Sequence, residues 1–167
     1  MKQIFLFLIF SLLVFSACSS NNDKKLFESA DQKIKAKNYS EALKDYEKIV
    51  EDYPDSENAA ASLFTAAGIY QGYQLTTISK EESMKKALGC YQKLFDDYPK
   101  DERAPKSLFM TGFINANELK NLEAARKAYQ SFLEKFPNHE LMASAKTELE
   151  NLGKTPEEIL LAKTVKK

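Results

Sequence analysis

The sequence predicts an all-α protein built from repeated pairs of helices. A nine-residue block that starts with tyrosine and ends with proline occurs three times, and an alanine lies four residues before each block. A Leu-Phe pair with a small residue three positions after the phenylalanine also recurs, once ahead of each block. The chain has 5 glycines and 5 prolines in 167 residues, which is few for the many turns of a β-rich fold. The blocks are YEKIVEDYP at 46–54, YQKLFDDYP at 91–99 and YQSFLEKFP at 129–137.

The Leu-Phe pattern marks the first helix of each pair, and the block from tyrosine to proline, with its alanine, marks the second helix. The alanine of the second helix lets the first helix approach closely, the tyrosine fills the gap to the next unit, and proline ends the helix because it has no N–H. The alanines are Ala42, Ala87 and Ala125, and the pairs are Leu26-Phe27, Leu63-Phe64 and Leu108-Phe109. We therefore expect helices at 24–36 and 40–52, at 57–73 and 81–97, and at 102–117 and 122–135.

Two further helices are expected after the third pair. Residues 140–152 place four apolar side chains on one face, as a terminal helix of a stack should; they are Leu141, Ala145, Leu149 and Leu152. Thr155, Pro156 and Glu158 then form a capping box that starts a short helix. The second pair has an insertion at residues 72–82, and Ser79 with Glu82 caps the helix that follows it.

The order of alanine, aromatic residue and proline resembles the tetratricopeptide repeat (TPR). The resemblance covers residues 26–152 and implies an all-α, TPR-type helix-turn-helix solenoid with about three repeats plus a C-terminal capping helix. In such arrays the first helices line a concave face. By this resemblance a partner-binding groove would contain Phe27, Phe64, Phe109 and Phe113. The alternative is that these rings belong to the core, in which case residues 72–82 are the next candidate surface.

The N-terminus has the pattern of a bacterial lipoprotein signal. Lys2 precedes an apolar run, which is followed by Phe15-Ser16-Ala17-Cys18. This string resembles a lipobox, and the resemblance implies cleavage before Cys18 and lipidation of its thiol. An ordinary secretory signal cut near Ala17 is the alternative. The expected organisation is a signal peptide at 1–17, a lipidated tether at 18–25, a TPR domain at 26–152 and a C-terminal short helix and tail at 153–167.

Composition argues against several other functions. Lys and Arg total 24, as do Asp and Glu, so the chain has no basic field for nucleic acid. One histidine and two cysteines cannot form a zinc cluster, and no phosphate-binding or nucleophile motif occurs, so we expect no metal, no cofactor and no catalysis. His139 is expected to be solvated. A thiol enzyme that uses Cys90 is the weak alternative, since a nucleophile needs a base nearby.

A lipid-anchored TPR protein resembles the BamD-like lipoprotein family of the outer-membrane assembly machinery, and also the TPR protein that coordinates the Tol-Pal system. The resemblance implies a non-catalytic scaffold in the outer membrane, facing the periplasm, with a role in outer-membrane protein assembly or envelope maintenance. Its partners would be envelope proteins or peptides on the concave face, and the membrane through the lipid. A pilotin-type lipoprotein and a regulator of cell-wall synthesis are the alternatives.

The lipidation hypothesis predicts the outcome of a single substitution. The Cys18→Ser protein should remain helical by circular dichroism but no longer sediment with membranes, because several acyl chains at about 0.8 kcal/mol per buried CH2 provide the anchor. Unchanged membrane fractionation would rule out the lipoprotein interpretation.

Overall fold

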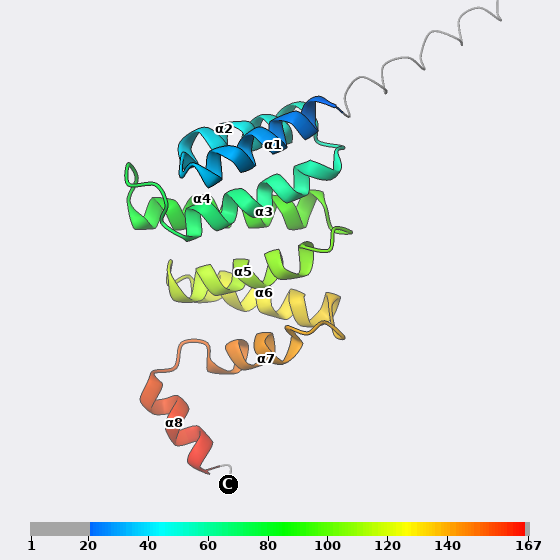
Figure 1. Ribbon diagram of the computed structural model, residues 1–167. Coiled ribbons are helices and arrows are strands. Elements are labelled where there is room, and N and C mark those ends of the chain that lie inside the picture. The colour runs from blue at the N-terminus through cyan, green and yellow to red at the C-terminus, as the bar shows by residue number, and fades with distance from the viewer. Residues whose placement is uncertain (1–20, 166–167) are drawn as a thin grey trace, which may run out of the picture. The chain divides into compact units, whose positions relative to one another are not determined.

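The computed structural model describes residues 21–165, so the predicted lipidation site, Cys18, lies outside the described residues. Residues 21–165 form eight helices and no strand (Figure 1). The helices are α1 Asn22–Lys35, α2 Tyr39–Asp52, α3 Glu57–Gln71, α4 Lys80–Asp97, α5 Ala104–Asn117, α6 Leu122–Lys135, α7 Met142–Asn151 and α8 Pro156–Val165. The prediction of an all-α, TPR-type arrangement of helix pairs is confirmed.

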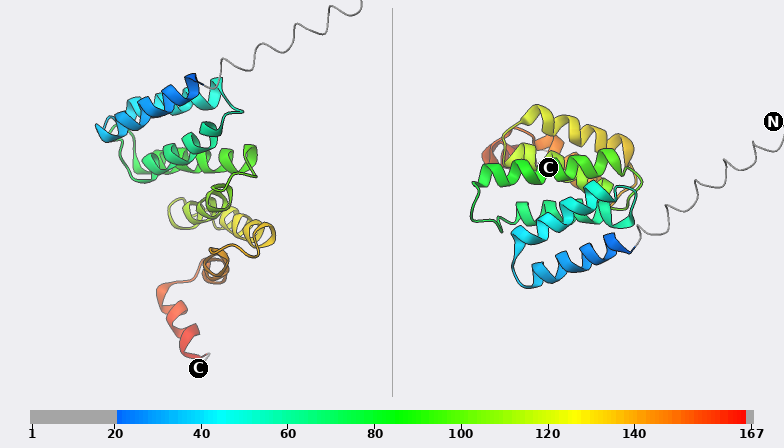
Figure 2. Two further views of the ribbon diagram at one scale, coloured as in Figure 1. Left: turned by 45° about the vertical axis from the view of Figure 1, so that its right-hand side comes forward. Right: turned by 90° about the horizontal axis from the view of Figure 1, so that it is seen from above.

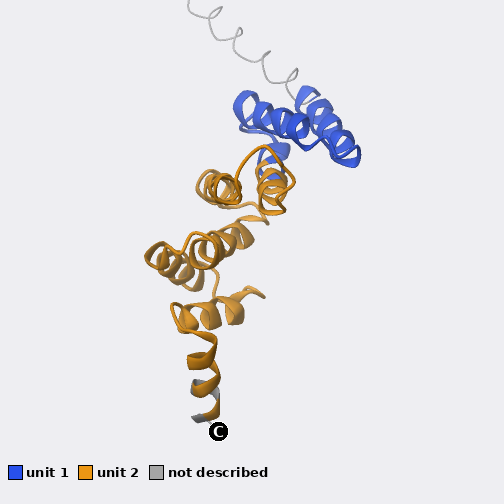
Figure 3. Ribbon diagram, turned by 90° about the vertical axis from the view of Figure 1, so that its left-hand side faces the viewer, with its two compact units in different colours: residues 1–62 blue, residues 63–167 orange. Residues whose placement is uncertain are grey.

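The chain forms two compact units, residues 1–62 and 63–167, which Figure 3 shows in different colours. In the first unit, α1 and α2 pack against each other as a hairpin, visible again in Figure 2. The core of this hairpin consists of fully buried side chains from both helices: Ala30, Ala42, Tyr46 and Ile49.

In the second unit, neighbouring helices pack in chain order. α5 contacts both α4 and α6, and α7 contacts α6. The end of α3 is joined to α4 by the buried hydroxyl of Ser83, which donates to the carbonyl oxygen of Tyr70 at 2.6 Å. The apolar face predicted for the closing helix is confirmed, because Ala145 is fully buried and three leucines pack on the same cluster; these are Leu141, Leu149 and Leu152.

One aromatic contact recurs in every helix pair. The phenylalanine of the first helix meets the tyrosine of the second edge to face, with ring centroids 5.6, 5.8 and 5.7 Å apart in the three pairs. The three alanines that precede these tyrosines are fully buried, which confirms the predicted register. The contacts are Phe27–Tyr46, Phe64–Tyr91 and Phe109–Tyr129.

The turn inside each pair depends on a left-handed residue that is not glycine. Lys37, Tyr73 and Lys120 have φ angles of 58°, 52° and 57°. In the first turn the Asn38 amide donates to the Lys33 carbonyl at 2.7 Å, a bond of the Schellman type that closes the helix. A left-handed backbone costs a residue with a Cβ about 1–2 kcal/mol, so each turn holds some strain.

The first helix begins earlier than the sequence predicted. Residues 22 and 23, which precede the helix expected from residue 24, belong to α1, and Asp23 is buried. Burial alone would raise the pKa of the Asp23 carboxyl, but the pKa is lowered overall, and the largest lowering contribution is the hydrogen bond that the Asn58 side-chain amide donates to Asp23 Oδ2 at 3.0 Å. A run without apolar residues therefore packs because its carboxylate is bonded to the start of α3.

The predicted helix caps of the second unit are present. The Ser79 side chain accepts a hydrogen bond from the Glu82 amide at 3.1 Å. Before α8, the Thr155 hydroxyl accepts from the Glu158 amide at 3.2 Å, and the Glu158 carboxylate accepts from the Thr155 amide at 2.8 Å. The capping box predicted from the sequence is confirmed.

Gly112 gives a test of the repeated tyrosine contact. A Cβ on Gly112 would lie 2.7–2.9 Å from the Tyr129 ring, which is fully buried and cannot move aside. We expect Gly112→Ala to lower the free energy of unfolding by about 1–3 kcal/mol, as overpacking does. Chemical denaturation measures this.

Gly89 is the matched control, because a Cβ there meets no atom within 4 Å and the site is exposed in α4. Gly89→Ala should raise stability by up to about 1 kcal/mol through helix propensity. Equal effects of the two substitutions would contradict the packing of Tyr129 against α5.

Candidate functional site

The phenylalanines predicted to form a groove are half-buried. Phe27 belongs to the first unit and contacts Tyr46. In the second unit, Phe109 contacts both Tyr129 and Phe132, with ring centroids 5.7 and 6.0 Å apart. These rings therefore help to hold the helix pairs together, and a role in partner binding stays a prediction.

The other two phenylalanines also lie on first helices of the second unit. The Phe64 ring contacts Tyr91, and the Lys106 ammonium lies 5.4 Å from the Phe64 ring centroid. Phe113 is half-buried, one turn beyond Phe109 on α5. Partly exposed edges of these rings remain on the α3 and α5 helices.

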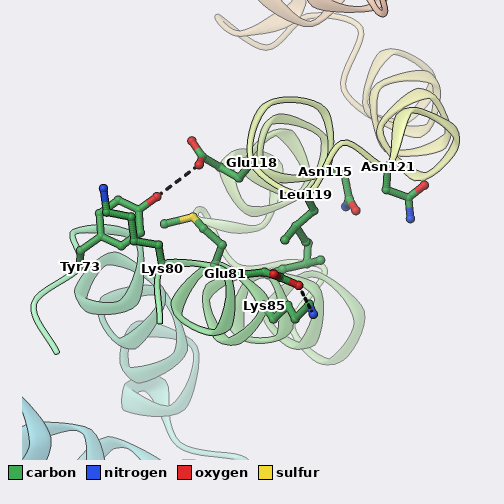
Figure 4. A pocket seen from close by; sticks show the side chains of 10 residues that line it. Tyr73, Lys80, Glu81, Lys85, Asn115, Glu118, Leu119 and Asn121 are labelled. Atoms are coloured by element: carbon green, nitrogen blue, oxygen red, sulfur yellow. Dashed lines mark hydrogen bonds and ion pairs between the residues drawn. The ribbon is translucent and has the colours of Figure 1, made fainter. Parts of the chain in front are cut away.

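The second unit contains a groove of about 750 Å³ between α4 and α5 (Figure 4). We call it the α4–α5 groove. Its walls come from the inserted loop, the first half of α4, the end of α5 and the α5–α6 turn. It is lined by Tyr73, Lys80, Glu81, Met84, Lys85, Leu88, Asn115, Glu118, Leu119 and Asn121.

Apolar side chains form part of the lining. Met84 and Leu88, one turn apart on α4, lie in the groove together with Leu119, which follows α5. Asn115 is buried, and its side-chain amide donates to the Thr111 carbonyl at 2.8 Å. The lining is thus held by helix packing and by an internal hydrogen bond.

The polar side chains of the groove are mostly paired with one another. Glu81 and Lys85 form an ion pair at 2.5 Å, and the Tyr73 hydroxyl donates to Glu118 Oε2 at 3.2 Å, both visible in Figure 4. Burial and the negative charge of Glu118 raise the pKa of the Tyr73 hydroxyl, so it stays a donor. Lys80 lies 5.5 Å from the Tyr73 ring centroid, and within the part of the chain that the structure describes it is the lining lysine without an ion pair.

A second hollow of about 370 Å³ lies on the other side of the α5–α6 turn. Two successive residues of this turn line different cavities. Leu119 lines the α4–α5 groove, whereas Lys120 lines the second hollow. Ile159 of α8 also lines the second hollow, so this face of α8 is turned toward the preceding helices.

Cys90 and His139 occupy structural positions. Cys90 is half-buried on α4. The pKa of the neighbouring Tyr91 is raised to about 12, first by burial of the tyrosine and second by the charge of Cys90. His139 is half-buried rather than solvated: its ring contacts Phe132 at 5.7 Å between centroids, and Nδ1 accepts from the Leu141 amide at 3.1 Å. The imidazole therefore accepts a hydrogen bond from the residue that precedes α7.

The described residues contain neither a metal-binding cluster nor a membrane-spanning helix. Within residues 21–165, no group of three or more His, Cys, Asp or Glu side chains is placed to hold a metal ion. In the same part of the chain, no helix has the length and apolar content to cross a membrane.

Sequence reasoning located only part of the groove. The insertion at residues 72–82 is the alternative binding surface predicted from the sequence. Tyr73 and Lys80 of this insertion line the groove. The apolar lining was missed. Met84 and Leu88 are apolar and one turn apart, but their spacing puts them on the same face of α4 as the core residues Ala87 and Tyr91, so the sequence pattern predicts core rather than groove.

The helix pairs, with their buried alanines and tyrosines, define a TPR-type repeat protein. The YfiO family of outer membrane lipoproteins matches residues 19–155, and the chain belongs to this family. The protein is therefore a lipoprotein of the bacterial outer membrane with a BamD-like, TPR-type fold. No match was found among curated proteins.

Proposed function

We propose that the protein is a non-catalytic, protein-binding scaffold, anchored by a lipid on Cys18 and facing the periplasm. Its role would be in outer-membrane protein assembly or envelope maintenance. Membership of an outer membrane lipoprotein family supports the location. The α4–α5 groove is the observation that carries the binding function, with partly exposed phenylalanines of α3 and α5 as a secondary surface.

The groove has the properties of a docking site for a protein segment. The partly exposed Leu88 and Leu119 offer apolar area whose burial drives association, and the lining also contains polar groups that are paired with one another. Because Glu81 and Glu118 are already bonded to groove residues, a segment that covers them leaves few charges unpaired. Packed helices hold the lining, which keeps the entropy cost of binding low.

Site-specific photo-crosslinking tests this function in the envelope. A photoreactive phenylalanine analogue at position 88 should crosslink to a protein chain, because Leu88 lies in the groove. The same analogue at exposed Thr147 of α7 is the control and should give little product. Leu119→Ser should weaken the position-88 product at least fivefold with little change in melting temperature.

Two outcomes would contradict the proposal. Equal crosslinking from positions 88 and 147 would mean that the groove has no preferred occupant. The second outcome concerns the variant with Phe64→Ser and Phe109→Ser. If this variant loses the crosslinked product while its melting temperature is unchanged, the phenylalanines are the binding site. We expect these two substitutions to lower the stability of the protein instead. Truncation of a buried aromatic ring costs about 3–5 kcal/mol, and these rings are half-buried.

A further inference from the structure

Helix α8 exposes two large apolar side chains. Leu160 is 63% exposed and Leu161 is 64% exposed. The last element of a helical stack normally presents a polar outer face to solvent. α8 has this apolar pair instead, although its Ile159 is turned toward the second hollow.

The exposed face of α8 combines a carboxylate with the two leucines. Residues at i, i+3, i+4 and i+7 share one side of a helix, so Glu157, Leu160, Leu161 and Thr164 form one stripe. All four of these side chains are exposed. The stripe offers a negative charge one turn before an apolar surface.

The α4–α5 groove offers the complementary groups in the same unit of the fold. Among the described residues Lys80 has no carboxylate partner, and it lies in the first turn of α4, where the helix dipole adds positive potential. The lysine is followed along α4 by the apolar side chains of Met84 and Leu88. A segment with a carboxylate one turn before leucine matches both the charge and the apolar lining.

We propose that the occupant of the α4–α5 groove is helix α8 of a second copy of this chain. Glu157 of the incoming helix pairs with Lys80, and Leu160 and Leu161 cover the partly exposed Leu88 and Leu119, beside the buried Met84. This inference rests on the proposed function, because it names the segment that the groove binds.

Two features of the chain favour a second copy as the partner. Each copy carries one groove and one α8. In a dimer with a two-fold axis, each α8 therefore lies in the groove of the other copy, and both grooves are filled. Anchoring in one membrane would raise their effective concentration.

Disulfide trapping between two differently tagged full-length copies tests the proposal. Both copies carry Cys90→Ser; one adds Leu88→Cys and the other adds Leu161→Cys. After mild oxidation of intact membranes, we expect a species with both tags that disappears on reduction. The control replaces Leu161→Cys with Met142→Cys, which is 37% exposed on α7 and should give at least tenfold less product.

A charge exchange tests the predicted register. Glu157→Lys should lower the trapped product at least threefold, and Lys80→Glu in the other copy should restore it. Glu158 is left unchanged because it caps α8. Circular dichroism and melting temperature check that each variant folds.

The possible results separate this inference from the proposed function. No trapped product, together with a position-88 photo-crosslink to a different protein, overturns the second copy as occupant and leaves the scaffold function in place. Equal trapping through Met142→Cys also overturns the inference. Absence of both the trapped product and the photo-crosslink contradicts both proposals.

Discussion

Each helix pair of this protein depends on the contact between one phenylalanine and one tyrosine. The ring centroids lie 5.6–5.8 Å apart in all three pairs, the distance at which edge-to-face packing is favourable. The tyrosine reaches this position only because a small residue faces it, and in the third pair that residue is Gly112. The buried alanine four residues before each tyrosine allows the same close approach. The packing of each pair follows from these three requirements.

The tyrosine hydroxyl shows how the repeats differ. Tyr46 donates to Asp31 Oδ1 at 2.9 Å and Tyr91 donates to Gln71 Oε1 at 3.0 Å. Among residues 21–165, the buried Tyr129 hydroxyl has no hydrogen-bond partner, and burial followed by the charge of Glu148 raises its pKa. The third pair therefore relies more on ring packing, with Phe132 added to the cluster.

The sequence predicted the helices well because their boundaries have local causes. Proline ends the second helices, and Ser79 and Thr155 start later ones, so each boundary can be read from a few residues. The orientation of the phenylalanines could not be predicted in this way. Leu108 and Phe109 are about 100° apart around a helix, and only the position of Tyr129 decides which side each one faces.

The turns and the groove required three-dimensional information for different reasons. The left-handed conformation of Lys37 and Lys120 had a possible signal, because both lysines precede an asparagine at the same point of the repeat. The groove had a weaker sequence signal, because its lining combines residues of α4 with residues that follow α5. The inserted loop contributes Tyr73, whose bond to Glu118 joins the two sides. A surface built from separate elements cannot be read from local patterns alone.

The double-mutant cycle of Phe109→Leu and Tyr129→Leu measures the central contact most directly. Free energies of unfolding for the two single variants and the double variant isolate the interaction between the rings. The edge-to-face contact at 5.7 Å predicts a coupling energy of about 0.5–1.5 kcal/mol. Additivity within about 0.3 kcal/mol would contradict the account, because the rings would then contribute independently to stability.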